Sequence, residues 1–260
     1  MRSIINGVII DNENIDNWKQ KGYVYEVLRV IDNTPLFLKE HLLRMKNSIK
    51  EIDIKSIENN LKKLIEIYDG NLNDNIFISV NIEKNETGIF IIKGFYPPKE
   101  WYENGIKINT CQIKRDDPGK KVYDINYKYT IQEHLKKTNV FETLITDNGV
   151  LNEGSRSNVF FIKDNEIFTP SVEAVLPGIT RDKVFEAAKA CAITIVETSI
   201  NTKDLNNFDG AFITGTSIDL LPIRQINEIC YKTTELDSFE KLLVCFEKIK
   251  NKDLVITNNE

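Results

Sequence analysis

The first 95 residues carry two kinds of apolar pattern, one typical of strands and one of helices. Four segments rich in Val, Ile, Phe and Tyr are bounded by turn-forming residues, which predicts strands. These segments are 2–10, 22–31, 75–82 and 88–95. Over 37–52 and again near 57–68 the apolar residues recur at helical spacing, which predicts two amphipathic helices. The order predicts a small α+β domain with an antiparallel sheet.

The polar stretch KRDDPG follows Ile113 and is the best candidate for a linker. It places a small domain at 1–113, a linker at 114–120 and a larger domain at 121–260. In this larger domain the apolar pattern alternates between short strands and longer helical segments. The predicted helices are 127–137, 180–192 and 238–250, and the predicted strands are 142–146, 159–162, 166–168, 193–196 and 210–214.

Composition excludes several classes of function. The chain has 260 residues, 34 basic against 39 acidic side chains and a net charge of -5, without a basic stripe. Nucleic-acid binding depends largely on neutralising phosphates, so no nucleic-acid partner is predicted. No run reaches the roughly 18 apolar residues of a membrane helix. The opening apolar stretch is broken at Asn6-Gly7, unlike the uninterrupted apolar core of a signal peptide. We expect a cytoplasmic protein, because the four scattered cysteines indicate a reducing setting.

The sulfur and imidazole side chains give no metal site. The four cysteines, Cys111, Cys191, Cys230 and Cys245, form no CxxC pair, and we expect reduced, buried thiols and no disulfide. The two histidines, His41 and His134, both fall within helical patterns. A His-rich zinc site is therefore excluded and a Ser-His-Asp triad is disfavoured. Chemistry must come from lysine, carboxylates, hydroxyls or a cofactor.

Three segments have a composition that packing alone does not require. LNEGSRSNVFF (151–161) places a carboxylate before Gly and small hydroxyl residues, although a capped turn with a solvated Glu153 has the same composition. LPGITRD (176–182) leads from Pro-Gly into a helix, whose first amides can hold a phosphate or simply mark a helix start. FITGTSIDLLPI (212–223) ends a strand in Gly-Thr-Ser. Each segment alone is weak evidence.

Together and in this order, the segments resemble fold-type IV (class IV) pyridoxal-phosphate-dependent enzymes. This family contains the branched-chain and D-amino-acid aminotransferases and aminodeoxychorismate lyase. The resemblance runs from Gly22 to Ile226 through five ordered motifs: GYVYEVLRV, FLKEHLLRM, NEGSRSNVF, LPGITR and TGTSIDLLPI. It implies an α+β fold of two domains, the larger with a barrel-like sheet and flanking helices. It also implies pyridoxal 5'-phosphate as cofactor and a homodimer.

The resemblance assigns roles to particular residues. Glu153 matches the partner of the cofactor's pyridine nitrogen. Arg44 matches the phosphate-binding arginine, since a guanidinium makes paired hydrogen bonds to phosphate oxygens; a solvated helix arginine is the alternative. The amides of Ile179 and Thr180, with the Thr216 hydroxyl or amide, would complete the phosphate cup. A lysine would hold the cofactor aldehyde as a Schiff base.

The position of this lysine depends on the register. In GKKVYDINYKY the family's usual short spacing, counted back from Asn126, reaches Tyr123 or Val122, so that the lysine would be missing. The longer register, measured to Glu142 and Glu153, places Lys121 at the lysine position. Lys120 is the adjacent alternative and Lys128 a remote one. On this register Asp124 stands where the family usually has Asn, and Asn126 or Tyr127 could substitute for it.

The resemblance is weakest for substrate recognition. Tyr25 matches a tyrosine lining the active site in the D-amino-acid branch, and it equally suits a packed strand aromatic. The strand ISVNIEKNETGIFII lacks the Arg-x-His and Arg-Gly that grip the substrate carboxylate in other branches. Ser217 could offer an amide to this carboxylate. Arg29 and Arg156 are charged alternatives, and each also suits a surface or interdomain position.

The resemblance therefore predicts a class IV aminotransferase that moves an amino group between an amino acid and a 2-oxo acid. The nearest alternative is 4-amino-4-deoxychorismate lyase, which uses the same lysine and cofactor to release pyruvate and 4-aminobenzoate. An alternative of another class is a non-catalytic binding protein that kept the fold and lost its lysine. Only the Tyr123 register favours this last interpretation.

Overall fold

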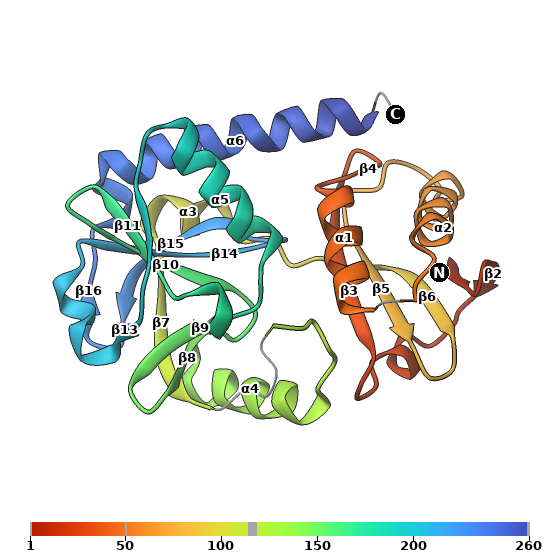
Figure 1. Ribbon diagram of the computed structural model, residues 1–260, viewed down its shortest axis with the longest axis horizontal. Helices are drawn as coiled ribbons and strands as arrows, with labels where there is room; N and C mark the ends of the chain where they lie inside the picture. Colours follow the sequence, from red (N-terminus) through yellow and green to blue (C-terminus); the bar gives the residue numbers. More distant parts are fainter. Residues whose placement is uncertain (1, 50, 114–118, 259–260) are drawn as a thin grey trace. The chain divides into compact units, whose positions relative to one another are not determined.

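A computed structural model describes residues 2–49, 51–113 and 119–258 of the chain (Figure 1). The chain divides into two compact units. Unit 1 comprises Met1–Phe95, Lys120–Asn126 and Lys250–Glu260. Unit 2 comprises Tyr96–Gly119 and Tyr127–Ile249. The mixture of helices and sheets in both units confirms the predicted α+β class.

Unit 1 contains one antiparallel sheet and two helices. Its strands are β1 (Arg2–Ile5), β2 (Val8–Asp11), β3 (Val24–Ile31), β4 (Thr34–Pro35), β5 (Asn75–Asn81) and β6 (Glu86–Ile92), and its helices are α1 (Leu38–Ser48) and α2 (Ile54–Glu66). The spatial order is β2-β1-β6-β5-β3-β4. The segment predicted as one strand over 2–10 is a hairpin, because Asn6 and Gly7 both adopt positive φ and reverse the chain.

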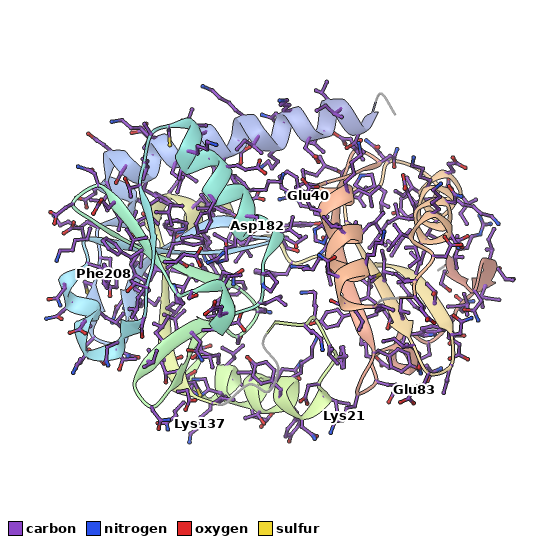
Figure 2. The ribbon with its side chains drawn as sticks, viewed as in Figure 1. Lys21, Glu40, Glu83, Lys137, Asp182 and Phe208 are labelled. Atoms are coloured by element: carbon purple, nitrogen blue, oxygen red, sulfur yellow. The ribbon has the colours of Figure 1, made fainter. Side chains whose placement is uncertain are left out.

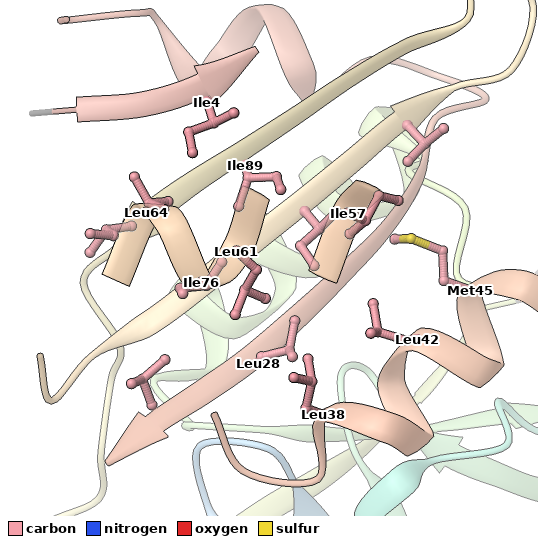
Figure 3. Close-up of a cluster of buried hydrophobic side chains, with 14 of the residues drawn as sticks. Ile4, Leu28, Leu38, Leu42, Met45, Ile57, Leu61, Leu64, Ile76 and Ile89 are labelled. Carbon is pink, nitrogen blue, oxygen red and sulfur yellow. The ribbon is translucent and has the colours of Figure 1, made fainter. Parts of the chain in front are cut away.

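The two helices of unit 1 cover one face of its sheet (Figure 3). Strand β3 alternates in burial, so that Leu28 faces the helices, where it packs with Leu42 of α1 and Leu61 of α2. The opposite face of the sheet carries an aromatic cluster that includes Trp18, Phe77 and Phe90. Because one face of β3 is buried under the helices and the other is half-buried, the register of the strand fixes the direction of each of its side chains.

Unit 2 is built on a larger sheet. Its strands are β7 (Ile106–Gln112), β8 (Thr143–Asp147), β9 (Val150–Gly154), β10 (Asn158–Lys163), β11 (Glu166–Thr169), β12 (Ile195–Glu197), β13 (Ile200–Asn201), β14 (Gly210–Gly215), β15 (Asp219–Ile226) and β16 (Ile229–Cys230). The order is β12-β11-β10-β14-β15-β7-β8-β9-β13, with β16 beside β15. Among the described strands β12 and β13 are the ends of this order, so the barrel-like sheet that the resemblance implies is not a closed barrel.

Three further helices belong mainly to unit 2, and a fourth begins there. They are α3 (Lys99–Asn104), α4 (Ile125–Thr138), α5 (Ile179–Ala190) and α6 (Asp237–Asn258). Helices α5 and α6 pack their apolar side chains on β10 and β14, where the rings of Phe160 and Phe212 stack with centroids 5.0 Å apart. This cluster fixes the start of α5 relative to the strands that carry the candidate site.

Strand β7 differs most from the sequence-based picture. The prediction placed no strand there and assigned it to the small domain at 1–113, whereas β7 pairs in parallel with both β15 and β8 of unit 2. The predicted linker at 114–120 lies mostly outside the described residues, which include only Gly119 and Lys120 of it. Lys120 and the residues after it to Asn126 fold with unit 1.

Charged side chains lie at the surface of the described residues. Lys21, Glu83 and Lys137 are exposed, as Figure 2 shows for their side chains. Among the described helices none is long and apolar enough to cross a membrane. In the same part of the chain no group of three or more His, Cys, Asp or Glu side chains is arranged to hold a metal ion.

Candidate active site

Arg44 lies on α1 of unit 1 and is bound by a carboxylate that the sequence did not single out. Its Nε and Nη2 donate to Oε1 and Oε2 of Glu26 at 2.7 and 2.6 Å. His41, one turn earlier on α1, contacts the same Oε2 through Nδ1 at 2.8 Å. The sequence alternative of a solvated arginine is therefore wrong: the Arg44 side chain is only 11% exposed.

This cluster of Glu26, His41 and Arg44 is electrostatically well defined. Burial raises the pKa of Glu26, but Arg44 and the His41 hydrogen bond outweigh it and lower that pKa to about 2. Burial lowers the pKa of His41, and the contact with Glu26 only partly opposes this. His41 is therefore neutral near pH 7 and donates its Nδ1–H to an ionised Glu26. The positive charges of Arg44 and Lys121 also lower the pKa of His41.

Lys121 lies beside β3 in unit 1. The Tyr25 amide donates to the Lys121 carbonyl at 3.0 Å, and Val122 forms an antiparallel bridge with Val24. Val122 packs on the apolar cluster beneath the helices, so the side chain of Lys121 points to the opposite face, that of Tyr25. Its Nζ lies 5.0 Å from the centroid of the Tyr25 ring. Lys120, the adjacent alternative, is exposed.

The Glu153 side chain of unit 2 contacts the LPG segment, residues 176–178. It lies on β9, is 4% exposed, and its Oε2 accepts from the Leu176 amide at 2.9 Å. Asn158 at the start of β10 donates to the Leu176 carbonyl, also at 2.9 Å. The backbone of Leu176 is thus held from both sides, which orients the Glu153 carboxylate. The alternative of a solvated Glu153 is wrong, because burial and this contact exclude it.

The start of α5 is an open helix terminus. Its N-cap is Gly178, which provides no side-chain cap, so among the described residues the first amides of the helix are not capped by a side chain. A Cβ at Gly178 would lie 2.0 Å from Asn158 Oδ1, so a larger residue there would have to displace the Asn158 side chain. Ile179 and Thr180 follow it and are buried. Their amides and the helix dipole form an arrangement that suits an anion.

The Gly-Thr-Ser segment forms the turn between β14 and β15. Thr216 and Ser217 lie in this turn, which the Ile218 amide closes on the Gly215 carbonyl at 3.1 Å. The residue before the turn, Thr214, pairs in register with Asn158. Thr214 is 1% exposed, and its Oγ1 has no hydrogen-bond partner within the described chain. A polar group is expected near this hydroxyl, because burying it without a partner is unfavourable.

A second buried carboxylate, Glu142, holds the loop between Glu153 and Asn158. It accepts from the Thr143 amide at 2.8 Å, the Ser155 amide at 3.1 Å and the Ser157 hydroxyl at 2.9 Å, and also from the Ser155 hydroxyl. Gly154 lets the loop close, since a Cβ there would lie 2.0 Å from Ser157 Oγ. Arg156, an alternative for the substrate carboxylate, is 56% exposed and donates to the Phe141 carbonyl.

The structure groups the predicted site residues within each unit. In unit 1 Tyr25 and Lys121 lie together, near the cluster that contains Arg44. In unit 2 Glu153 contacts the segment that starts α5, and the turn with Thr216 and Ser217 follows the strand paired with Asn158. Glu26, Glu142, Asn158 and Thr214 were not assigned roles from the sequence. The one available signal was the acidic Glu26 at a position of β3 whose alternating neighbours Val24 and Leu28 are apolar.

Comparison with known proteins places these residues in a family context. The profile of the family described as "Amino-transferase class IV" matches residues 23–226, most of the chain. A D-alanine aminotransferase from Bacillus licheniformis is 26% identical, over 87% of this chain and 89% of its own. A putative branched-chain-amino-acid aminotransferase from Methanocaldococcus jannaschii is 28% identical over 96% of each chain. An aminodeoxychorismate lyase from Bacillus subtilis is 25% identical, over 88% and 86%.

The fold is also that of solved structures. A putative branched-chain amino acid aminotransferase from Thermotoga maritima superposes with a TM-score of 0.80, covering 95% of this chain and 96% of its own, at 21% identity. An aminotransferase from Brucella abortus, bound to the cofactor PLP, superposes with a TM-score of 0.76 over 96% of this chain and 99% of its own, at 18% identity. At these identities the likeness concerns the fold alone. It confirms the fold class predicted from the five motifs.

Proposed function

The chain belongs to the class IV aminotransferase family, and we propose that it uses pyridoxal 5'-phosphate to move an amino group between an amino acid and a 2-oxo acid. The observation that carries the proposal is the contact of Glu153 with the LPG segment, which joins a buried carboxylate to an open helix start in one unit. A cofactor with a pyridine nitrogen and a phosphate requires these two groups.

The residues present fit such a group. At Gly178, which has no Cβ, the backbone lies close to the Asn158 side chain. Thr214 has a buried hydroxyl for which the described residues supply no hydrogen-bond partner. In the proposed assignment Arg44, the amides of Ile179 and Thr180, and Thr216 hold the phosphate. Glu153 holds the proton of the pyridine nitrogen.

Lys121 is the proposed lysine of the reaction. When bound, pyridoxal 5'-phosphate accepts the electron pair left at the substrate Cα after its proton departs. The Lys121 amine would take this proton from Cα and return one during transfer, as a positioned general base and acid. The direction of its side chain toward Tyr25 supports Lys121, whereas Lys120, the residue before it, is exposed.

Substrate recognition follows the same placement. Tyr25 would line the substrate site beside Lys121, and Ser217 would offer an amide to the substrate carboxylate from the turn after β14. Small amino acids and 2-oxo acids are the proposed substrates. We further propose that the protein is a cytoplasmic homodimer. Size-exclusion chromatography with light scattering tests the oligomeric state.

The second candidate is 4-amino-4-deoxychorismate lyase activity, which the Bacillus subtilis relative favours. The two reactions differ in what they require. Pyruvate release from aminodeoxychorismate without any 2-oxo acid acceptor identifies the lyase. Amino-group transfer from D-alanine or a branched-chain amino acid, dependent on an added 2-oxo acid, identifies the aminotransferase.

The decisive experiment is borohydride reduction of the protein with pyridoxal 5'-phosphate, followed by peptide mapping. We expect the cofactor to be fixed on Lys121. The variant Lys121→Ala should lose this labelling and the transferase activity, whereas the matched variant Lys120→Ala should keep both. Labelling at Lys120 or Lys128 would show that this residue, and not Lys121, forms the Schiff base. Cofactor binding without labelling of any lysine would instead indicate the non-catalytic binding protein.

A further inference from the structure

A second chemical cluster lies in unit 2 among residues to which the proposed function gives no role. Cys111 on β7 has its Sγ 3.4 Å from Nδ1 of His134 on α4. The other ring nitrogen of His134, Nε2, lies 3.2 Å from Oδ1 of Asn109, two residues before Cys111 on the same face of β7. Thr143 Oγ1 is 3.4 Å from this same nitrogen.

The partners of His134 determine where its proton lies. Asn109 Oδ1 only accepts hydrogen bonds. Thr143 donates its hydroxyl hydrogen to the Asn109 carbonyl at 3.3 Å, so that Oγ1 also acts as an acceptor toward the ring. Both neighbours of Nε2 therefore accept, and Nε2 carries the hydrogen of the neutral ring. The lone pair of Nδ1 consequently faces the Cys111 thiol.

From this geometry we infer that Cys111 is a nucleophilic thiol with His134 as its base and Asn109 as the residue that orients the base, and that it reacts with small disulfides. A thiol, a base within hydrogen-bond reach and a third group holding the base is the arrangement that activates nucleophiles. The cluster is no metal site, because the described residues contain no group of three potential ligands.

The reaction is a thiol–disulfide exchange and is balanced. His134 Nδ1 takes the proton of the Cys111 thiol as Sγ attacks one sulfur of the disulfide. A bond forms between Cys111 Sγ and that sulfur, the original S–S bond breaks, and the departing thiolate receives the proton from His134. Cys111 is oxidised to a mixed disulfide, and half of the small disulfide is reduced to a thiol. No further oxidant is required.

The other cysteines are internal standards. Burial raises the pKa of both Cys111 and Cys191, so burial alone predicts that neither thiol reacts readily at neutral pH. Cys191 donates to the Ala188 carbonyl at 3.6 Å. The expectation that all four cysteines are buried is wrong: Cys230 is exposed, and the other three are half-buried. If accessibility alone decided reactivity, Cys230 would react first. If the base decides, Cys111 reacts first.

The test incubates the full chain with glutathione disulfide and quantifies the mixed disulfide at each of the four cysteines by peptide mass spectrometry over time. We expect Cys111 to be modified about 10-fold faster than Cys230. In His134→Gln the Cys111 rate should fall at least about 10-fold, since a positioned base contributes about 10²–10⁴-fold to such steps. The Cys230 rate in the same sample should not change.

Asn109→Ala is the second variant. It leaves the base in place and removes one acceptor that fixes its tautomer, so we expect a smaller fall in the Cys111 rate with Cys230 again unchanged. Slow modification of Cys191 in each variant reports that the core around α5 is intact. Modification of Cys230 before Cys111 overturns the proposal. An unchanged Cys111 rate in both His134→Gln and Asn109→Ala overturns the role of the base.

Discussion

Each unit contains a carboxylate that is almost completely buried, and the two are stabilised in different ways. Glu26 of unit 1 is 1% exposed and is paired with a cation, Arg44, and a neutral His41. Glu142 of unit 2 is 0% exposed and is held by two backbone amides and two serine hydroxyls. The cost of burial is offset in the first case by a closely paired opposite charge. In the second it is offset mainly by dipoles, since the nearest cation, the exposed Arg156, has its Nε 3.9 Å from Glu142 Oε2.

The difference has a consequence for what each carboxylate can position. Glu26 fixes a side chain, the Arg44 guanidinium, which is proposed to hold the cofactor phosphate. Glu142 fixes a backbone loop, which connects Glu153 to Asn158. The Glu26 pair can be removed by substitution, because both members are side chains. The environment of Glu142 is not removed by changing side chains alone, because two of its donors are the backbone amides of Thr143 and Ser155.

The largest expected effect is therefore at Glu142. Glu142→Ala leaves two buried and two partly buried donors without their acceptor, and we expect unit 2 to lose about 3–5 kcal/mol of unfolding free energy. The chain has two tryptophans, Trp18 in unit 1 and Trp101 in unit 2, whose ring packs on Phe141 at 4.9 Å. Trp101 fluorescence during urea unfolding, in a Trp18→Phe background, reports this loss.

Glu142→Gln is the matched control for this substitution. The side-chain amide oxygen of Gln still accepts hydrogen bonds, so this variant should recover part of the unfolding free energy. The recovery should be incomplete, because the amide NH₂ replaces the second carboxylate oxygen and faces donors that Glu142 accepts from in the parent. Stability of Glu142→Ala within about 1 kcal/mol of the parent would show that the loop does not depend on this carboxylate.

The next largest effect is at Glu26. Glu26→Leu removes the carboxylate that pairs with the positive charge of Arg44, which is nearly buried. We expect unit 1 to lose about 2–3 kcal/mol of unfolding free energy. This loss is smaller than for a fully buried ion pair, because the Arg44 side chain is 11% exposed. Combining Glu26→Leu with Arg44→Met should recover part of this loss, because an apolar pair replaces the ion pair. Trp18 fluorescence in a Trp101→Phe background measures both.

The same pair of variants separates stability from cofactor binding. In the proposed function the double variant should bind pyridoxal 5'-phosphate more weakly than the parent even where its stability is restored, because the phosphate partner is gone. A loss in the double variant equal to the sum of the losses in Glu26→Leu and in Arg44→Met alone would mean that Glu26 and Arg44 are not energetically coupled.

A smaller effect is the pH dependence of the stability of unit 1, which separates the contributions of His41 and Glu26. The pKa of His41 is lowered in the fold, so the unfolded chain binds the proton first, and stability falls as pH drops below about 6.5, the ordinary value for histidine. The pKa of Glu26 is lowered from 4.5 to about 2, so a second loss follows as pH falls from about 4.5 toward 2. Trp18 fluorescence during urea unfolding between pH 7 and 4 measures the first loss.

His41→Gln is the control, since its amide still donates to Glu26 but does not titrate. The first loss, below pH 6.5, should be absent in this variant. Parallel curves for the parent and His41→Gln down to pH 5 would contradict the assignment of a neutral buried His41.

The sequence anticipated the helices better than the sheet of unit 2. Helices α1 and α5 have apolar residues at helical spacing, which is a local signal, and both were predicted within a few residues. Five strands of unit 2 were missed: β7, β9, β13, β15 and β16. Of the two longest, β7 mixes polar and apolar residues and β15 carries Pro222 at an inner strand position. Their pairing is set by distant partners rather than by local composition.

The site shows the same limit. Motif order identified Arg44 and Glu153 as candidates, but Glu26 binds Arg44 across 18 positions and Glu142 binds Ser157 across 15. Neither contact has a local pattern. The Cys111–His134 pair spans 23 positions and was equally invisible, since each residue alone suits packing.

The smallest expected effect concerns two hydroxyls of unit 2. Ser157 donates to Glu142, whereas Thr214 Oγ1 has no partner among the described residues. Ser157→Ala should therefore lower the unfolding free energy by about 1 kcal/mol. Thr214→Val replaces a buried hydroxyl by a methyl group. It should leave the unfolding free energy of the cofactor-free chain unchanged or raise it by up to about 1 kcal/mol. If this hydroxyl serves the phosphate, the same variant weakens pyridoxal 5'-phosphate binding, measured by titration of cofactor absorbance. A loss of stability in the cofactor-free Thr214→Val would instead mean that the hydroxyl already has a partner, and the proposed cup would lose its support from Thr214.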